Sequence, residues 1–323
     1  KDWMNKGGAY EETAVLYRSN AQSRAIEEAL LRISIPYRIY GGLRFYERLE
    51  IKNAIAYLKI IFNNNDNPSF ERSISNPTRG VGEKTLGKIR QTAQKYNISY
   101  IKASAKLIDE GSISGRGGSG LRDYLEFVAG CKSFIEENSL SDLMELIIKE
   151  SGLYSYHAKE AGEKGKTRTE NLEELITATK NFEQSVKEDK TNTEIAENYL
   201  DVISLDAGDR QAAEHDDAAQ LMTMHSAKGL EFKLVLLTGL EESLFPHGRS
   251  MESASQLEEE RRLCYVAITR AMEKLYITHA ESRRLHGNDT FNPPSRFLRE
   301  IPKDLIDEIR PRAQTNIPYN RKD

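Results

Sequence analysis

Residues 232–240 read FKLVLLTGL, a nearly continuous apolar run that closes with a threonine, a glycine and a leucine. An apolar run without alternation is typical of a strand that helices cover on both faces. A helical pattern, LEEERRLCYVAITRA, follows at 257–271, and a second strand pattern, KLYITHA, follows at 274–280. The order strand, helix, strand predicts a parallel α/β sheet in this part of the chain.

The N-terminal end of the chain shows the same alternation. TAVLYRS at 13–19 and PYRIYGG at 36–42 have strand character, and NAQSRAIEEALLRIS at 20–34 has the spacing of an amphipathic helix. A β-α-β unit of this length cannot bury a core alone. QLMTMHS at 220–226 adds a strand pattern after the polar linker 206–219. We therefore expect the two ends of the chain to meet in one sheet.

The middle of the chain has helical apolar spacing almost throughout, and no strand pattern stands out in it. Insertions are tolerated at surface loops, and Gly41 and Gly42 provide a suitable exit from the sheet. The sequence thus predicts an α/β fold, a parallel-sheet domain interrupted by a large, mainly helical insertion. The predicted boundaries are 1–42 for the first part of the sheet domain, 43–212 for the insertion, 213–302 for the second part and 303–323 for a flexible tail.

The bulk composition, with 38% hydrophobic and 30% charged residues in 323, fits a soluble globular protein of about two domains. No apolar run approaches the ~18 residues of a membrane helix, and the N-terminus lacks a signal-peptide layout, so the sequence predicts a cytoplasmic protein without a membrane partner. Cys131 and Cys264 have no paired spacing, which supports neither a disulfide framework nor a metal site. The formal net charge of -4 argues against a uniformly cationic nucleic-acid binder.

The stretch TMHSAKGLEF, residues 223–232, carries the first candidate side chains. On an extended strand Thr223 and His225 share one face, so two hydrogen-bonding groups point the same way. The chain then turns, which is expected to place Gly229 and Glu231 at the carboxyl end of a strand, where open α/β sheets bind ligands. A satisfied core threonine and histidine beside a solvated lysine, Lys228, remain the alternative.

The helical pattern at 257–271 carries an arginine. Leu263, Ala267 and Arg270 stand at positions i, i+4 and i+7, which predicts that Arg270 projects from the apolar face of its helix. An arginine there needs an anionic partner because burial of an unpaired charge is costly. The partner is either a functional anion or a carboxylate in a structural ion pair.

A glycine-rich turn, NPTRGVGEKTLG, occupies residues 76–87. The surrounding stretch 78–95 holds one acid, Glu83, and five basic residues: Arg79, Lys84, Lys88, Arg90 and Lys95. Gly80 and Gly82 allow a tight turn into a helix, whose first N–H groups can meet a DNA phosphate without reading bases. An ordinary helix corner with solvated lysines is the alternative.

The stretches TMHSAKGLEF and EERRLCYVAITRA (259–271), in this order and spacing, resemble motifs V and VI of the superfamily 1 DNA helicases of the UvrD/Rep/PcrA group. The resemblance extends over nearly the whole chain, through AVLYRSNAQSRAIEEALL (14–31), PYRIYGGLRFYERLEIKNA (36–54), NPTRGVGEKTL (76–86), GEKGKTRTENLEEL (162–175), LEESLFPHGRS (240–250) and PSRFL (294–298). It implies that the sheet domain is the second RecA-like motor domain, called 2A, and that the insertion is the domain called 2B.

The resemblance implies a nucleotide site that is shared with another domain. Arg270 matches the arginine finger that reaches the γ-phosphate of ATP and stabilises transition-state charge. Glu231 matches a carboxylate that contacts the nucleotide ribose, and Gly229 belongs to the same motif. The implied cofactor is ATP with Mg²⁺.

The resemblance also implies two DNA sites. Thr223, His225, His247 and Asn20 match residues that hold single-stranded DNA. The duplex-contacting turn of 2B is matched by Thr78, Arg79, Gly80, Gly82 and Lys84. His286 stands where relatives often carry tyrosine or phenylalanine, and an imidazole stacks less well on a base.

The chain lacks GxxxxGK[ST] and an acidic strand end for Mg²⁺. The nearest imitation, AKEAGEKGKT at 158–167, has Glu160 where the first glycine belongs. ATP and Mg²⁺ are therefore expected to be held mostly by an N-terminal RecA-like domain of the same protein, and this chain alone is expected neither to hydrolyse ATP nor to unwind DNA.

The resemblance implies 3′ to 5′ movement on single strands and work on duplex or junction DNA, with repair proteins as possible partners. UvrD, Rep and PcrA identities stay open. The alternative from another class is a non-catalytic DNA-binding or protein-interaction module.

Overall fold

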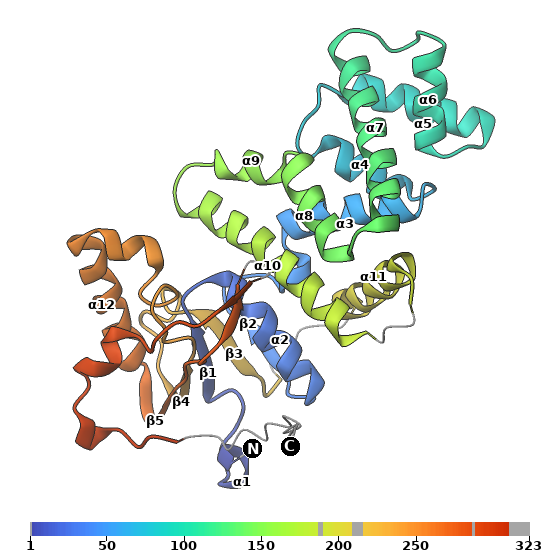
Figure 1. The fold of residues 1–323 in the computed structure, drawn as a ribbon. Helices are drawn as coiled ribbons and strands as arrows, with labels where there is room; N and C mark the ends of the chain where they lie inside the picture. Colours follow the sequence, from blue (N-terminus) through green and yellow to red (C-terminus); the bar gives the residue numbers. More distant parts are fainter. Residues whose placement is uncertain (1, 187–189, 209–215, 286–287, 310–323) are drawn as a thin grey trace, which may run out of the picture.

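The computed structural model describes residues 2–186, 190–208, 216–285 and 288–309. Its centre is a five-stranded parallel sheet of order β2-β3-β1-β4-β5 (Figure 1). The strands are β1 (Thr13–Tyr17), β2 (Tyr37–Ile39), β3 (Ala219–Thr223), β4 (Phe232–Leu237) and β5 (Ala271–Ile277). Strands from both ends of the chain alternate in the sheet, which confirms the predicted joining of the two ends.

Helices cover both faces of the central strand β1, all five of whose residues are buried. Ala14 and Leu16 pack with the face that meets α12 (Ala254–Ile268), while Val15 and Tyr17 pack on the opposite face with α2 (Ser23–Arg32). This two-sided cover explains why the strands read as apolar runs instead of alternating.

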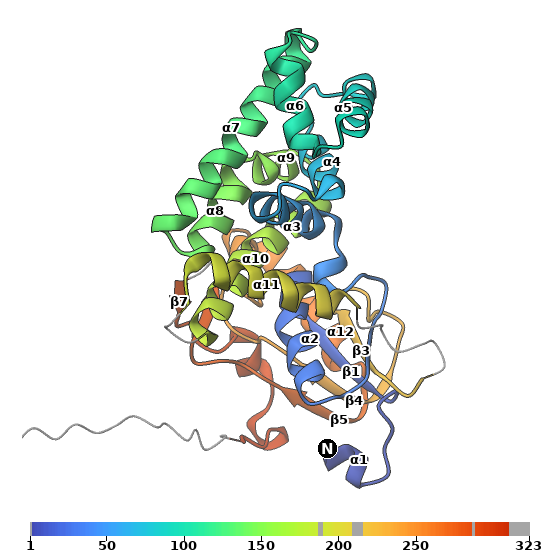
Figure 2. The same ribbon diagram turned by 90° about the vertical axis from the view of Figure 1, so that its right-hand side faces the viewer.

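The insertion between β2 and β3 is helical, and its long axis leads away from the sheet (Figure 1, Figure 2). Its helices are α3 (Leu49–Phe62), α4 (Asn67–Ser75), α5 (Glu83–Tyr96), α6 (Tyr100–Asp109), α7 (Gly115–Glu137), α8 (Leu140–Glu150), α9 (Leu153–Ala158), α10 (Glu163–Ser185) and α11 (Asn192–Gly208). Fully buried aromatic rings, among them Tyr57, Phe70 and Tyr124, pack together in a core separate from that of the sheet. The predicted fold class is confirmed.

Short elements complete the described chain. They are α1 (Asp2–Asn5), the hairpin strands β6 (Arg283–Leu285) and β7 (Asn288–Thr290), and the 3₁₀ turns Asn20–Gln22, Phe45–Glu47, Gly248–Glu252, Arg296–Glu300 and Lys303–Leu305. His286 and residues 310–323, which form most of the predicted tail, lie outside the described residues.

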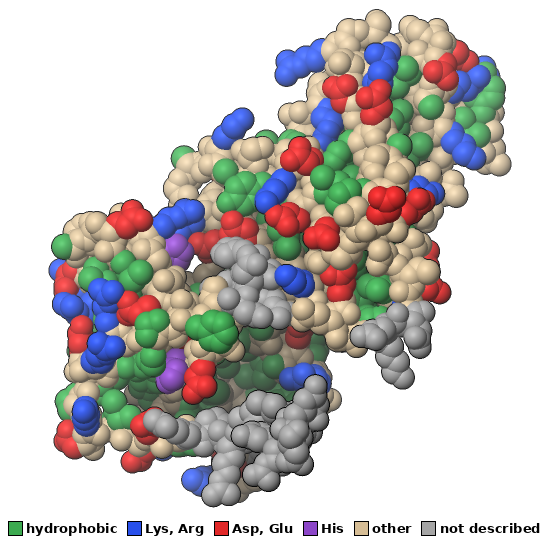
Figure 3. Space-filling model, in the orientation of Figure 1, with side chains coloured by type: hydrophobic (Ala, Val, Ile, Leu, Met, Phe, Trp, Pro, Cys, Tyr) green, Lys and Arg blue, Asp and Glu red, His purple; other side chains and the backbone are tan. Residues whose placement is uncertain are grey.

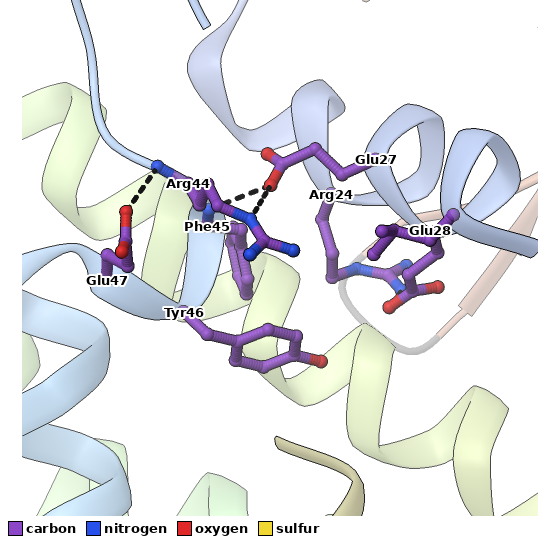
Figure 4. A pocket seen from close by; sticks show the side chains of 8 residues that line it. Arg24, Glu27, Glu28, Arg44, Phe45, Tyr46 and Glu47 are labelled. Carbon is purple, nitrogen blue, oxygen red and sulfur yellow. Dashed lines mark hydrogen bonds and ion pairs between the residues drawn. The ribbon is translucent and has the colours of Figure 1, made fainter. Parts of the chain in front are cut away.

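The join between the sheet domain and the insertion is polar (Figure 4). Glu27 of α2 accepts a hydrogen bond from the backbone N–H of Phe45, at 3.2 Å, and lies 4.0 Å from the guanidinium of Arg44. Next to them, Arg24 of α2 pairs at 2.7 Å with Glu174 of α10. Charged and hydrogen-bonded groups, rather than an apolar face, therefore connect the two parts here.

Candidate functional site

The turn between β3 and β4, residues 224–231, crosses the sheet from its carboxyl edge to its amino edge. Both strands run parallel to β1 and flank it on opposite sides. Thr223 at the end of β3 lies opposite Tyr17, whereas Leu234 near the start of β4 lies opposite Thr13. A segment that joins two parallel strands has to return along their whole length.

This crossing separates the candidate residues of TMHSAKGLEF into two groups. Thr223 and His225 stay at the carboxyl edge, and Gly229 and Glu231 lie toward the amino edge. The expectation that Gly229 and Glu231 lie at the carboxyl end of a strand is therefore wrong. Gly229 has φ +86° with open space around it, so backbone conformation rather than crowding favours glycine there. Glu231 is exposed.

Arg270 lies against this same turn. Its guanidinium donates to the carbonyl oxygens of Leu230 and Val266, both at 2.9 Å, and to the hydroxyl of Thr269 at 3.0 Å. In the described part of the chain no carboxylate forms an ion pair with it. Arg270 is thus held in place by neutral acceptors.

The helix that was expected to carry Arg270 ends two residues earlier. Helix α12 finishes at Ile268, Thr269 caps it, and β5 begins at Ala271. The predicted position on the apolar face of a helix is therefore wrong. The anionic partner of Arg270 stays a prediction. Arg270 stands at the junction of helix and strand, half-buried, where the carbonyl of Val266 at the helix end and the carbonyl of Leu230 in the turn accept its N–H donors.

At the carboxyl edge, β1 and β3 end side by side, with Met224 N–H bonded to the carbonyl of Tyr17. Asn20 follows β1 in a 3₁₀ turn and is half-exposed, and His225 follows β3 and is exposed. Thr223 exchanges hydrogen bonds with Ser226, which holds the start of the turn. Desolvation first, and then the nearby charge of Arg18, lower the pKa of His225.

A buried ion pair ties this edge to the loop that carries His247. Arg18 donates to both carboxylate oxygens of Glu260, with the shortest contact at 2.6 Å. Glu260 also accepts from the backbone N–H of His247 at 3.2 Å and from the hydroxyl of Ser250 at 3.3 Å. Arg18 and Glu260 thus bring His225 and His247, two predicted single-strand contacts from distant parts of the chain, to one edge.

The insertion reaches the same place through Glu170 of α10. One carboxylate oxygen accepts a hydrogen bond from the hydroxyl of Ser19, and the other lies 3.4 Å from Nε2 of His247. Sequence reasoning missed both Ser19 and Glu170. The only signal for them is that each lies within a segment that resembles the helicases, AVLYRSN and TRTENLEEL.

The second candidate surface lies far from the sheet, at the glycine turn before α5. Thr78, Gly80, Gly82 and Lys84 are exposed. Gly80 has φ +75°, and Gly82 is the N-cap of α5 without any side-chain cap. The first N–H groups of α5 are thus exposed beside Lys84, as an anion site at a helix start requires.

Arg79 of the same turn points inward. Its guanidinium donates to the carbonyl oxygens of Ser73, Pro77 and Ser151 and stacks over the rings of two buried tyrosines. These donors are used within the protein, so Arg79 fixes the shape of the turn.

The start of α7 packs against this turn. The sequence reasoning missed that contact. A Cβ on Gly120 would lie 1.9 Å from the carbonyl oxygen of Arg79, and one on Gly117 would lie 3.1 Å from that of Gly80. Arg116 is exposed next to Gly80. The run of glycines in ISGRGGSG, unusual inside a helix, was the available signal.

Figure 3 shows acidic and basic side chains intermixed over both parts of the molecule in that view. Among the described residues, no group of three or more His, Cys, Asp or Glu side chains could hold a metal ion. No described helix is long and apolar enough to span a membrane.

The described chain is a parallel α/β sheet interrupted by a helical insertion, and Arg270 stands at the end of a helix beside the turn between β3 and β4. Residues 1–114 and 121–282 match the UvrD-like helicase C-terminal domain, and the chain belongs to this family.

Relatives match this chain over essentially its full length. It is 46% identical to DNA helicase II of Escherichia coli (strain K12) over 322 residues. That match covers 100% of this chain and 44% of the relative. It is 48% identical to DNA helicase II of Haemophilus influenzae, over 99% of this chain and 44% of the relative. ATP-dependent DNA helicase PcrA of Bacillus subtilis is 39% identical, over 96% and 42%. The chain thus spans less than half the length of these relatives.

Proposed function

We propose that this chain is the C-terminal portion of an ATP-dependent DNA helicase of UvrD type that moves 3′ to 5′ on single strands in DNA repair or replication. The sheet domain serves as motor domain 2A, in two parts at 1–42 and 213–302, and the insertion at 43–212 serves as 2B. The observation that carries the proposal is Arg270, held by neutral acceptors at the edge of the sheet with its charge unpaired by any described carboxylate.

In the proposed ATP site Arg270 acts as arginine finger toward a γ-phosphate bound by an N-terminal RecA-like domain of the same protein. Its contact with the carbonyl of Leu230 supports this role, because it places Arg270 beside Gly229 and Glu231, the proposed ribose-contacting turn. The phosphate cradle and the Mg²⁺ ligands are assigned to the other domain.

In the proposed single-strand site, Asn20, Thr223, His225 and His247 contact the backbone of the strand. Their convergence at the carboxyl edge of β1 and β3 supports this assignment. In the proposed duplex site, Thr78, Gly80, Gly82 and Lys84 grip a backbone phosphate, while Arg79 holds the turn from within.

The proposed activity predicts the direction of unwinding and a requirement for the N-terminal domain in ATP hydrolysis. Joined to the N-terminal domain, the protein is expected to unwind a duplex with a 3′ single-stranded tail when ATP is present and to leave a 5′-tailed duplex intact. The chain alone is expected to release phosphate from ATP only at background level, because it has the arginine without the cradle. Strand separation and DNA-stimulated phosphate release test both points. If the chain alone hydrolyses ATP at a rate comparable with that of the longer protein, the requirement for the N-terminal domain is contradicted.

The duplex site predicts a variant that binds DNA less well without losing stability. Gly82→Asp places a capping carboxylate on the N–H groups of α5, which stabilises a helix start or leaves it unchanged but repels a phosphate. Gly82→Asp and Lys84→Ala are each expected to weaken binding to junction DNA irrespective of sequence, and Lys84→Ala to reduce the salt slope by about 1. Fluorescence anisotropy with junction DNA at several salt concentrations measures both effects.

Lys95→Ala is the matched control, since Lys95 is an exposed lysine at the other end of the same helix, over the ring of Tyr96. Its affinity for junction DNA should equal that of the unchanged chain. If Gly82→Asp binds junction DNA as tightly as the unchanged chain does, the turn is not part of the duplex site.

A further inference from the structure

The proposed single-strand site contains an anion that belongs to the protein. Glu170, on the helical insertion, directs its two carboxylate oxygens at the hydroxyl of Ser19 and at Nε2 of His247. Both partners belong to the sheet domain. The side chains of Glu170 and His247 are 22% and 19% exposed, so the contact lies at the mouth of the site, where a DNA strand would arrive.

Each of the two donors has a single hydrogen to give. The backbone N–H of Arg249 donates to Nδ1 of His247 at 3.4 Å, which in the neutral ring leaves the hydrogen on Nε2, the nitrogen that lies 3.4 Å from Glu170. The hydroxyl of Ser19 gives its one hydrogen to the same carboxylate. While the Glu170 carboxylate stays beside both donors, it stands between them and a phosphate oxygen.

The positive charges near Glu170 lie next to other carboxylates, so they do not cancel its negative charge. Arg18 is held by Glu260, and Lys166, one turn before Glu170 on α10, lies 3.8 Å from Glu163. A phosphate that enters the site therefore meets the carboxylate of Glu170 as a like charge. The hydrogen bonds that Glu170 accepts outweigh its burial and lower its pKa, which keeps it ionised.

We propose that Glu170 occupies the position of a DNA phosphate between Ser19 and His247, so that a residue of the insertion sets the affinity of the single-strand site. The inference rests on the proposed function, in which His247 contacts single-stranded DNA. Phosphate and carboxylate compete for the same two hydrogens, and the strand binds after displacing Glu170 from them.

The test uses the full 323-residue chain and a fluorescein-labelled oligothymidylate strand, with affinity measured by anisotropy. Glu170→Gln keeps the shape of the side chain and removes its charge. It is expected to bind the strand about fivefold tighter at low salt, the effect of removing one like charge at contact distance. The gain should shrink as added salt screens the repulsion.

Glu174→Gln is the matched control. Glu174 lies one turn further along α10 and also joins the insertion to the sheet domain, through Arg24, but Arg24 is not part of the single-strand site. Glu174→Gln is expected to leave the affinity for the strand unchanged. An equal gain in both variants would overturn the proposal, because it would show that any loosening of the insertion strengthens binding.

A double variant separates this inference from the proposed function. His247→Ala alone should weaken strand binding, and Glu170→Gln should give no gain in the His247→Ala background. If His247→Ala has no effect, the proposed single-strand site fails, and the inference with it. If His247→Ala weakens binding but Glu170→Gln does not strengthen it, only the role of Glu170 is refuted. Unchanged affinity for blunt-ended duplex DNA reports that the variants are folded.

Discussion

Replacement of Arg270 by alanine is expected to lower kcat for DNA-stimulated ATP hydrolysis by about 10³- to 10⁵-fold in the protein joined to its N-terminal domain. The guanidinium is the only part of this chain assigned to the transferred phosphoryl group. Its donors are arranged by Leu230, Val266 and Thr269 before ATP arrives, so little reorganisation is needed in the transition state. Phosphate release with saturating single-stranded DNA measures the effect.

Affinity for DNA separates a catalytic role of Arg270 from a structural one. Arg270→Ala should bind single-stranded DNA as the unchanged protein does, because Arg270 lies away from the carboxyl edge. Arg270→Lys keeps the charge but not the planar fork, and should recover only part of the activity. Arg32→Ala, an exposed arginine at the end of α2, should keep full activity. A kcat for Arg270→Ala within tenfold of the starting value would refute the finger assignment.

Removal of the Glu260 carboxylate is expected to have the largest effect on stability. Glu260→Ala should lower the free energy of unfolding of the sheet domain by about 3–5 kcal/mol, because it leaves the buried guanidinium of Arg18 without its counter-charge. Urea unfolding followed by the fluorescence of Trp3, the single tryptophan, measures the loss. Trp3 lines the same cavity as the sheet residues Val15 and Leu234, so its fluorescence is expected to report on this domain.

Glu259→Ala is the control, since the neighbouring side chain on the same helix is 70% exposed and, among the described residues, pairs only with the exposed Arg262. It should cost less than about 1 kcal/mol. A loss of that size for Glu260→Ala would contradict the structural role of the Arg18–Glu260 pair.

The stabilisation by Glu260 also has an expected pH dependence. Burial acts to raise its pKa, but hydrogen bonds from Arg18 and the charge of Arg18 outweigh burial and leave the pKa lowered. A carboxylate whose pKa is lowered in the folded state stabilises the fold fully above the ordinary glutamate pKa of about 4.3. The difference between the unchanged chain and Glu260→Ala should therefore be complete at pH 7 and disappear as the pH falls through the lowered pKa.

The fold class could be predicted from the sequence because it depends on local patterns. The five residues of β1 are all buried, and their unbroken apolar character follows from helices on both faces. The end of α12 could not be predicted from such a local pattern. Apolar spacing continues from Leu263 through Ala267 to Arg270, yet the helix stops at Ile268 because the chain enters β5.

The candidate site could be predicted only in part. Arg270, His225 and the glycine turn stand out by residue type within recognisable stretches. Glu170 did not, since a glutamate on a charged helix looks like part of a solvated face. Its partner Ser19 lies 151 residues away.

The sequence by itself determined that strands from both ends of the chain enclose a helical insertion, and which helicase family the chain belongs to, because apolar periodicity and motif spacing are local properties. Only the tertiary structure decided that Gly229 and Glu231 lie with Arg270, that Arg79 faces inward, and that Glu170 of the insertion reaches Ser19 and His247. Those pairings depend on which distant side chains the fold brings within a few ångströms, and the energy of a charge depends on its neighbours in space.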